Sequence, residues 1–150
     1  MKALLQRVSS ASVEVDGAQI ASIQSGLLVF LGVATGDTQQ QVTWLADKVT
    51  GLRIFPGSGT GSDAEKPMNR SVVDVGGEIL VVSQFTLAAD TSRGRRPGFA
   101  TAAAPEAAEQ LYEAFVAELQ KTMPVQVGQF GADMQVALVN DGPVTFLLER

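Results

Sequence analysis

Cysteine and histidine are both absent from the 150 residues of this chain. Without cysteine there is no disulfide framework, no thiolate nucleophile and no cysteine-bound zinc or iron–sulfur site. Without histidine there is no Ser-His-Asp triad, and the commonest general base and transition-metal ligand is missing. An enzyme built from this sequence must therefore use hydroxyls, carboxylates, backbone dipoles or a group on its own substrate.

Long apolar runs and export signals are also missing. The apolar stretch 26–33 is far shorter than the roughly 20 residues of a membrane span, and no signal peptide is recognisable. We therefore expect a cytoplasmic protein with no membrane segment. The formal net charge of −5 argues against indiscriminate binding to nucleic acid. It leaves room for a local basic patch, because salt screens charges beyond about 8–10 Å.

The pattern of apolar residues predicts one α/β domain that spans residues 1–150. Hydrophobic residues make up 45% of the chain, which is a globular composition. Period-two and continuous apolar runs predict strands over residues 1–15, 19–24, 27–33, 78–87, 125–128, 134–139 and 144–148. Helical spacing predicts two helices, one that begins with Asp37 as N-cap and one that begins at Pro105. The glycine- and serine-rich segment 56–67 predicts a loop. The expected fold class is a single compact domain, a curved and mainly antiparallel sheet or partial barrel with two packed helices.

The first candidate for chemistry is the run Ser83-Gln84-Phe85-Thr86 at the end of a predicted strand. Alternation places Ser83 and Phe85 on one face of that strand, and Gln84 and Thr86 on the other. Polar groups at the end of a buried strand stand where active sites often form, although such hydroxyls also bond to neighbouring backbone. With no histidine present, neither hydroxyl has its usual activating base, which gives little support to a hydroxyl nucleophile.

Two further segments carry unusual polar residues. Asn140-Asp141-Gly142-Pro143-Val144-Thr145 has the composition of a turn between two apolar strands. Arg93-Gly94-Arg95-Arg96-Pro97 places three guanidinium groups within four residues, which can bind phosphates bidentately or form a solvated loop. No dense carboxylate cluster and no phosphate-binding glycine motif is present, so we expect neither a metal nor a cofactor.

The two polar runs together closely resemble the D-aminoacyl-tRNA deacylase family. Ser83-Gln84-Phe85-Thr86 and Asn140–Thr145 stand at the family's spacing near the end of a short chain. Gln6-Arg7-Val8, Ala88-Ala89-Asp90-Thr91 and Ala132-Asp133-Met134-Gln135-Val136 fit the same pattern. The likeness therefore runs end to end, with one departure in the segment 57–67, which is longer and richer in glycine than is usual.

The resemblance implies a homodimer with two active sites at its interface and D-aminoacyl-tRNA as the substrate. It implies that the Gly142-Pro143 peptide bond is cis and that this dipeptide enters the active site of the other subunit. Ser83, Gln84, Phe85 and Thr86 would line the pocket for the terminal aminoacyl-adenosine. Arg7 would help to hold the Gly-Pro loop, and Asn140, Thr145 and Met134 would belong to the substrate-binding set. Arg93, Arg95 and Arg96 are expected to meet tRNA phosphates.

The chemistry that follows from this resemblance is chiral selection by collision. Two carbonyl oxygens of a cis Gly-Pro can face the substrate's α-ammonium, so that an L side chain strikes them and a D side chain does not. Glycine has no side chain to reject, so glycyl-tRNA should also be cleaved. Either Thr86 acts as nucleophile, or the neighbouring ribose hydroxyl assists while backbone amides near Phe85 and Thr86 stabilise the oxyanion. The absence of histidine and cysteine favours the second.

Three other functions stay open on the sequence alone. An inert tRNA- or nucleic-acid-binding module would keep the fold without turnover. A small Ser/Thr esterase would cleave simple esters and ignore tRNA. A scaffold dimer would leave Ser83-Gln84 and Gly142-Pro143 without a role.

Overall fold

The computed structural model describes residues 1–59 and 67–150, so most of the loop predicted over 56–67 lies outside the described residues. The elements are, in chain order, β1 (Lys2–Val15), β2 (Ala18–Ile23), β3 (Gly26–Gly32), α1 (Gln39–Gly51), β4 (Glu78–Ser83), the short 3₁₀ helix η1 (Phe85–Ala88), α2 (Pro105–Gln120), β5 (Val125–Val127) and β6 (Gln135–Glu149). The predicted fold class, a curved and mainly antiparallel sheet with two packed helices, is confirmed.

Strand β1 lies at the centre of the sheet because it pairs antiparallel with three other strands. On one edge, residues 2–8 pair with β3 and residues 11–15 pair with β2. On the other edge, β1 pairs with β6 over nearly its whole length. Beyond β3 the sheet continues with β4, which is parallel to β3, and then with β5, which is parallel to β4. The turn predicted between β1 and β2 is confirmed, with positive φ at Asp16 and Gly17.

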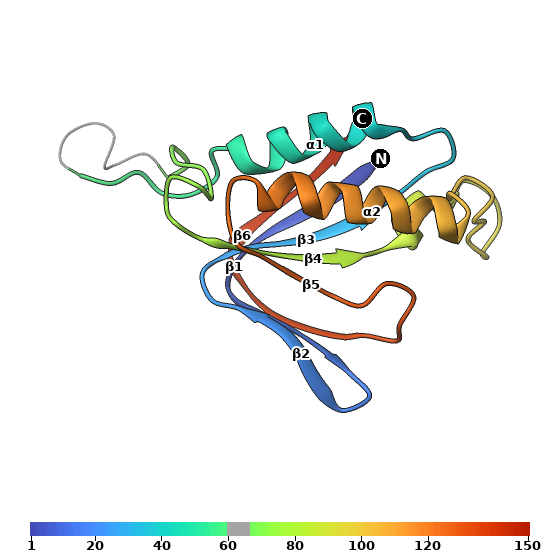
Figure 1. The fold of residues 1–150 in the computed structure, drawn as a ribbon, viewed down its shortest axis with the longest axis horizontal. Helices are drawn as coiled ribbons and strands as arrows, with labels where there is room; N and C mark the ends of the chain where they lie inside the picture. Colours follow the sequence, from blue (N-terminus) through green and yellow to red (C-terminus); the bar gives the residue numbers. More distant parts are fainter. Residues whose placement is uncertain (60–66) are drawn as a thin grey trace.

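Helices α1 and α2 lie side by side across one face of the sheet (Figure 1). Their apolar stripes face the sheet, as their spacing predicts. The buried helical residues are Val42, Leu45, Ala46, Val49, Ala108, Tyr112, Phe115, Val116 and Leu119. They pack on Leu5, Leu27 and Ile79, whose side chains are fully buried. No helix in the described parts of the chain is long and apolar enough to cross a membrane.

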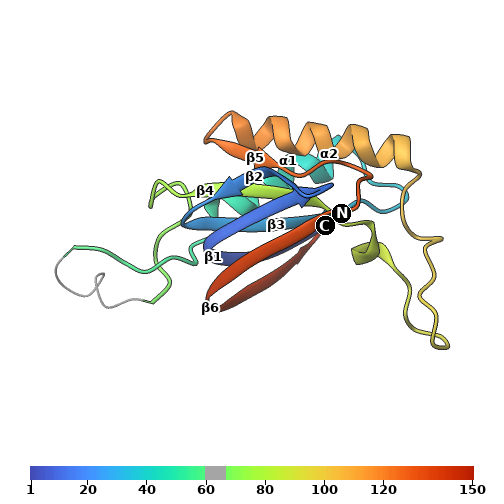
Figure 2. The ribbon, with the colours of Figure 1, turned by 90° about the horizontal axis from the view of Figure 1, so that it is seen from below.

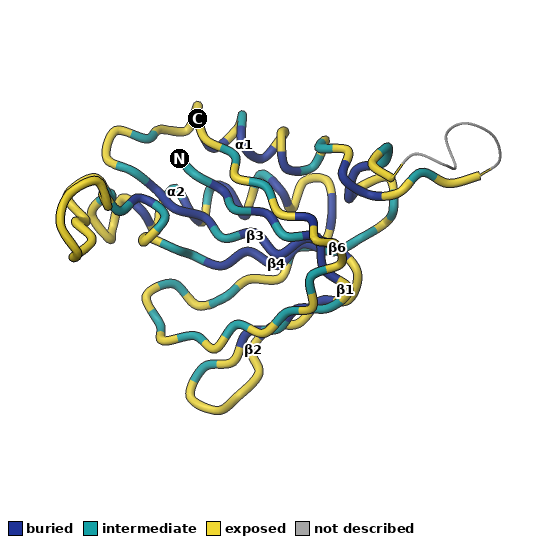
Figure 3. The backbone as a smooth tube through the Cα atoms, turned by 180° about the vertical axis from the view of Figure 1, so that it is seen from behind, coloured by how far each residue is buried: buried dark blue, intermediate teal, exposed yellow. Residues whose placement is uncertain are grey.

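The opposite face of the sheet is covered in part by the sheet itself. The far half of β1 and β2 curls beneath β3 and β4, as Figures 1 and 2 show. A second, smaller core lies between these layers, where Val13 and Ile23 pack with Leu28 and Leu80. Burial is highest in β3 and β4, whereas β2 and β6 are largely exposed or intermediate (Figure 3). The sheet therefore keeps an uncovered margin along β6.

Helix α1 begins one residue later than the sequence predicts. Its N-cap is Thr38 and not Asp37, because the Thr38 and Gln41 side chains form a reciprocal capping box. Asp37 accepts hydrogen bonds from the Ala34 amide and from the Met1 ammonium group instead. The ion pair that withdraws Asp37 from the cap joins segments 36 residues apart, which no local pattern reveals.

The strand predicted over 78–87 ends at Ser83, and the chain turns there into η1. The prediction was wrong for its last residues, and so was the alternation that assigned Ser83 and Phe85 to one face. The cause is a close approach at the end of β3. A Cβ added to Gly32 would lie 2.8 Å from Leu87 Cβ and 3.0 Å from the Gln84 carbonyl oxygen, so the turn packs directly on bare backbone.

Candidate functional site

The run Ser83–Thr86 lies where β4 ends and η1 begins. Ser83 and Gln84 are half-buried, whereas Phe85 and Thr86 are exposed. The Gln84 amide donates to the Leu31 carbonyl at 2.8 Å, which extends the contact with β3 by one residue. The first hydrogen bond across η1 joins the Leu87 amide to the Gln84 carbonyl. The amides of Phe85 and Thr86 precede that bond and take no part in it.

An apolar cavity of about 360 Å³ lies beside this turn. It is lined by Leu31, Val33, Ser83, Gln84, Phe85, Phe99, Ala102, Ala103, Pro105, Ala108, Tyr112, Phe130 and Gly131. The rings of Phe85 and Phe99 lie 5.1 Å apart between centroids and are 59% and 41% exposed. Large rings that stay exposed beside an apolar cavity can stack on a planar group such as a nucleobase.

Tyr112 connects the cavity to the backbone of β4. Its hydroxyl donates to the Val81 carbonyl at 3.0 Å, and the Gly128 amide donates to the same oxygen at 2.9 Å. Its ring packs 5.8 Å from that of Phe130. Burial raises the pKa of Tyr112 to about 12, so the phenol stays protonated and keeps donating at neutral pH. Tyr112 thus fixes the strand two residues before Ser83.

A second cavity, of about 260 Å³, lies on the other side of Ser83–Phe85. Met134 and Val136 line it, together with Gly131 and Ala132. The Met134 sulfur lies 2.8 Å from the place a Cβ on Gly128 would take, so it fills space that only a glycine leaves free. Met134, predicted as a substrate-binding residue, therefore lies beside the Ser83–Phe85 turn.

The hydroxyl of Thr86 has an amide as its neighbour. Gln84 Nε2 donates to Thr86 Oγ1. An amide neither takes nor gives up a proton in this pH range, so it cannot serve as the general base that a hydroxyl nucleophile needs. The structure therefore brings Gln84 and Thr86 together in an arrangement that orients the hydroxyl without activating it.

Residues 141–144 form a bulge in β6. Gln6 of β1 pairs with Thr145 and Val8 pairs with Asn140, so the bulge stands opposite Arg7 alone. The sequence predicted a turn between two separate strands, which was wrong because both halves pair with the one continuous strand β1. The Gly142-Pro143 peptide bond is cis, as the resemblance implies.

The bulge has no room for a side chain at Gly142. A Cβ there would lie 2.0 Å from the Val144 nitrogen and 3.2 Å from Asn140 Oδ1. Asp141, Gly142 and Pro143 are nonetheless exposed, so the bulge presents mainly backbone to its surroundings. Thr145, just beyond it, is also exposed and accepts a hydrogen bond from Gln6 Nε2 at 3.3 Å.

Arg7 and Asn140 hold the bulge from within the chain. Arg7 Nε donates to the Asp141 carbonyl at 3.0 Å and lies 3.0 Å from the Asp141 carboxylate. Asn140 Nδ2 donates to the carbonyls of Arg7 and Val144 at 2.9 and 3.1 Å, so one amide closes both ends of the bulge. Asn140, predicted to bind substrate, thus has a clear structural task.

The bulge and the Ser83–Thr86 turn do not meet within one chain. Ser83 pairs with Leu31, which pairs with Ala3, whereas the bulge lies opposite Arg7 on the far edge of β1. The turn and the bulge are separated by four residues along β1 and by three strand spacings across the sheet. At about 3.3 Å per residue and 4.8 Å per strand, the distance between them is roughly 20 Å. A single protomer therefore cannot offer both motifs to one small group.

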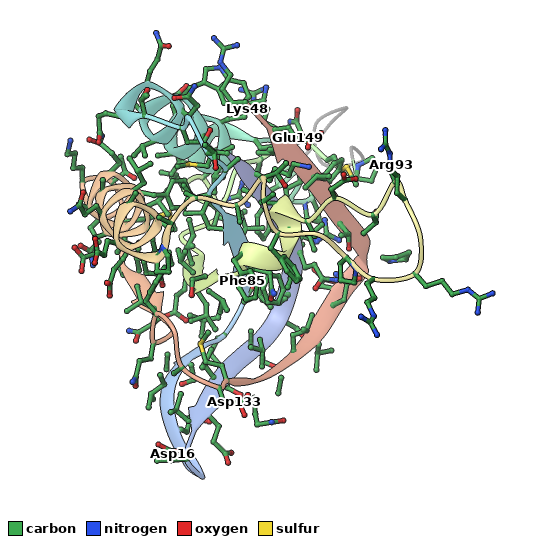
Figure 4. The ribbon with its side chains drawn as sticks, turned by 90° about the vertical axis from the view of Figure 1, so that its right-hand side faces the viewer. Asp16, Lys48, Phe85, Arg93, Asp133 and Glu149 are labelled. Carbon is green, nitrogen blue, oxygen red and sulfur yellow. The ribbon has the colours of Figure 1, made fainter. Side chains whose placement is uncertain are left out.

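The three loop arginines lie at the same end of the molecule as the turn. Asp90 and Gly98 exchange backbone hydrogen bonds of 2.8 and 2.9 Å, which close the loop at its base. Arg93, Arg95 and Arg96 at its tip are all exposed. Figure 4 looks onto this end, with Phe85 near the centre and the Arg93 loop extending away from the body. The predicted basic patch is thus accessible and stands beside the cavity.

Sequence reasoning found Phe85 but missed the other three aromatic residues of the cavity. Phe99 and Phe130 lie in segments with no clear period, and helical spacing assigned Tyr112 only to a core stripe. One signal was available for Tyr112. A tyrosine on the buried stripe of a helix needs a partner for its hydroxyl, which predicts an acceptor beyond the ordinary apolar packing.

The comparisons with known proteins agree along the whole chain. A family model described as D-Tyr-tRNA(Tyr) deacylase matches residues 4–149. A D-aminoacyl-tRNA deacylase of Roseiflexus castenholzii is 59% identical over 99% of this chain and 92% of the relative. A D-aminoacyl-tRNA deacylase of Geotalea uraniireducens is 55% identical over 99% of this chain and 93% of the relative. A solved structure described as the c-Myc DNA Unwinding Element Binding Protein has a TM-score of 0.89 at 43% identity, covering 100% of this chain and 99% of that one.

The raised pKa of Tyr112 predicts a late phenol titration that can be read directly, because this is the chain's one tyrosine. Tyrosinate absorbance should rise with a midpoint of about 12 in the folded protein and near about 10 in denaturant. Because the folded pKa lies above the unfolded one, the phenol's contribution to stability is complete below about pH 10 and is lost as the pH rises beyond it. Circular dichroism should be followed in parallel, with Tyr112→Phe as the blank. A midpoint near 10 in protein that is still folded would contradict the burial argument.

Proposed function

The chain belongs to the D-Tyr-tRNA(Tyr) deacylase family, and from that premise we propose that it releases D-amino acids from tRNA in the cytoplasm and spares L-aminoacyl-tRNA. Its activity is that of a D-aminoacyl-tRNA deacylase, a hydrolase of the ester bond between amino acid and tRNA. The observation that best supports the finer proposal is the placement of the Ser83–Thr86 turn beside an apolar cavity with exposed aromatic rings.

The terminal adenosine and its ester occupy the cavity and the turn. An adenine ring fits an apolar space of about 360 Å³, and Phe85 and Phe99 supply rings on which it can stack. The ester carbonyl then lies at Ser83–Thr86, where the amides of Phe85 and Thr86 can donate to the oxyanion that forms during hydrolysis.

Water attacks the ester carbonyl carbon, and the neighbouring ribose hydroxyl of the substrate relays a proton to the departing ribose oxygen. The products are the free amino acid and tRNA, so water supplies the added oxygen and both protons. Substrate assistance fits a chain without histidine or cysteine. It also fits a Thr86 hydroxyl whose bonded neighbour is the Gln84 amide.

Chiral selection comes from the Gly142-Pro143 backbone of a second subunit. The bulge presents backbone and no Gly142 side chain, so its carbonyl oxygens can approach the substrate's α-ammonium closely. An L side chain would strike these oxygens, whereas a D side chain points away from them. Collision can discriminate strongly, while the loss of a methyl contact gives only about 1–3 kcal/mol. Glycyl-tRNA, which has no side chain to reject, is a substrate on the same reasoning.

The second subunit covers the sheet face opposite the helices. Leu4 pairs with Leu147 on one side and with Phe30 on the other, so the three form one cross-strand row. Leu147 is 50% exposed, and Leu4 and Phe30 are only half-buried. Such a row is costly to leave in water, and a homodimer that covers it can also bring each bulge to the partner's turn.

The decisive experiment is hydrolysis of matched D- and L-tyrosyl-tRNA by the purified protein, with chelator present throughout. Release of D-tyrosine alone supports both the activity and the selection by collision. Glycyl-tRNA in the same assay should be cleaved. Binding without release would identify an inert tRNA-binding module, and equal release of both enantiomers would end the collision account. Cleavage of simple esters without tRNA hydrolysis would identify an ordinary esterase.

Substrate assistance predicts opposite effects when a hydroxyl group is removed from the protein and when one is removed from the substrate. Thr86→Ala should retain measurable turnover of D-tyrosyl-tRNA, because its hydroxyl is not the nucleophile. Replacing the neighbouring ribose hydroxyl of the terminal adenosine with hydrogen should abolish turnover by the unaltered protein. Single-turnover rates, measured with binding checked separately, distinguish the two. Complete loss in Thr86→Ala with normal fold and binding would make Thr86 the nucleophile.

A site shared between subunits predicts recovery of activity on mixing. Phe85→Ala/Phe99→Ala should disable the turn's side of the site, because it removes both rings on which the adenine stacks. Gly142→Ala should disable the bulge, because its Cβ has no room. A mixed dimer of the two holds one intact turn that faces one intact bulge, so exchange of subunits should restore about a quarter of the wild-type rate. Neither variant alone should do so. No recovery after verified exchange would mean that each site is built from a single chain.

The exposed arginine loop predicts salt-dependent tRNA binding. Replacing Arg93, Arg95 and Arg96 with glutamate should weaken binding and flatten the dependence of affinity on salt, by roughly one unit of slope per lost phosphate contact. Arg53→Glu, at an exposed position on another part of the chain, is the matched control and should leave the slope nearly unchanged. An unchanged slope in the triple variant would remove the loop from the tRNA contact.

A further inference from the structure

Arg7 is a buried cation in a strand whose other inward residues are apolar. Ala3 and Leu5 precede it on the helix-facing side of β1 and are fully buried, and Arg7 itself is only 8% exposed. Burial of a guanidinium is costly unless its donors and charge are met. On the side of the bulge they are met by Asp141, through its carbonyl and its carboxylate.

The other side of the Arg7 guanidinium is held by the segment that follows α1. Arg7 Nη1 donates to the Ile54 carbonyl at 2.5 Å, and the guanidinium carbon lies 5.9 Å from the centroid of the Phe55 ring. Phe55 is 4% exposed, so its ring contacts the cation away from solvent, where a cation–π contact is strongest.

The segment that holds Arg7 is itself fixed by backbone pairing. The Phe55 amide donates to the Arg70 carbonyl at 2.9 Å, and the Arg70 amide donates back to the Phe55 carbonyl at 3.0 Å. The Asn69 amide also donates to the Phe55 carbonyl, at 2.9 Å. Backbone pairing therefore fixes the Phe55 ring on one side of the Arg7 guanidinium, and the other side of the guanidinium holds the bulge.

We propose that Phe55 is a positioning residue for chiral selection, which acts by holding the guanidinium of Arg7 beneath the 141–144 bulge. Phe55 does not reach the proposed substrate site. Its ring and the Ile54 carbonyl fix one side of the guanidinium, and this fixes where Arg7 Nε holds the Asp141 carbonyl and hence the backbone that follows it. The proposal rests on the proposed function, in which the Gly142-Pro143 backbone rejects L substrates.

The substitution Phe55→Leu tests whether the Phe55 ring fixes Arg7 or merely fills the core. The substitution keeps an apolar side chain and removes the π face. If Arg7 then gains freedom, the bulge carbonyls lose their position, D-tyrosyl-tRNA cleavage slows and L-tyrosyl-tRNA cleavage rises. The ratio of the two kcat/KM values should fall by roughly 2- to 30-fold, the range that a cation–π contact supports.

Phe115→Leu is the matched control. Phe115 of α2 is fully buried in the helix-facing core, and the same substitution there removes the same atoms. It should lower the thermal midpoint at least as much as Phe55→Leu and leave the D/L ratio unchanged. In an Arg7→Met background, Phe55→Leu should have no further effect on the ratio, because the pair then acts as one unit. An unchanged ratio in Phe55→Leu, or an equal fall in Phe115→Leu, overturns the proposal.

A spectroscopic measurement separates this proposal from the proposed function. The Nε–H resonance of Arg7, identified by its loss in Arg7→Lys, should shift and exchange faster with solvent in Phe55→Leu than in the wild type and in Phe115→Leu. This readout needs no turnover. If the wild-type protein does not cleave D-tyrosyl-tRNA, the proposed function fails while the resonance still reports the contact. If the enzyme is selective and the resonance does not move in Phe55→Leu, the positioning role alone fails.

Discussion

The antiparallel pairing of β1 with β2, β3 and β6 is the constraint on which the rest of the structure depends. Because one 14-residue strand pairs with all three, its register sets the position of every functional segment at once. Its pairing with β3 places the end of β4, and with it Ser83, opposite the first residues of β1. Its pairing with β6 places the bulge opposite Arg7. A shift of one residue would turn Arg7 to the other face and leave the bulge without its buried cation.

This register also explains why the proposed active site needs two chains. The Ser83–Thr86 turn lies at one end of the sheet, and the bulge lies on the far edge of β1, roughly 20 Å away by strand geometry. No rotation of a side chain closes such a gap, and the pairing of β6 with β1 on both sides of the bulge prevents the backbone from moving there. The uncovered row that includes Leu147 gives a second copy an apolar face on which to dock. In the proposed dimer, one assembly would therefore both cover that face and complete the site.

The sequence predicts what depends on local period and turn chemistry. The strands that pack on the helices and both helical stripes follow from apolar spacing, and the Asp16-Gly17 turn follows from its residue types. What local patterns leave out depends on contacts between distant segments. The Met1 ammonium draws Asp37 away from the helix cap, and Gly32 admits the turn that ends β4 at Ser83. In the site, the polar runs stand out because they interrupt apolar strands. Phe99 and Phe130 do not, since a phenylalanine in a loop looks the same in sequence whether it lines a cavity or not.

When a site works through backbone groups, side chains outside the site must set the positions of those groups. A chain with neither histidine nor cysteine has few side chains that can do acid–base chemistry at neutral pH, so amides and carbonyls must be aimed accurately. The direction of a backbone amide or carbonyl is set by the hydrogen bonds made to neighbouring residues. The Tyr112 hydroxyl and the Gly128 amide fix the Val81 carbonyl behind the turn, while Arg7 and Asn140 hold the bulge. Each of these donors is at least partly buried and most are far apart in sequence, so the core of this protein and its proposed active site are parts of the same hydrogen-bonded framework.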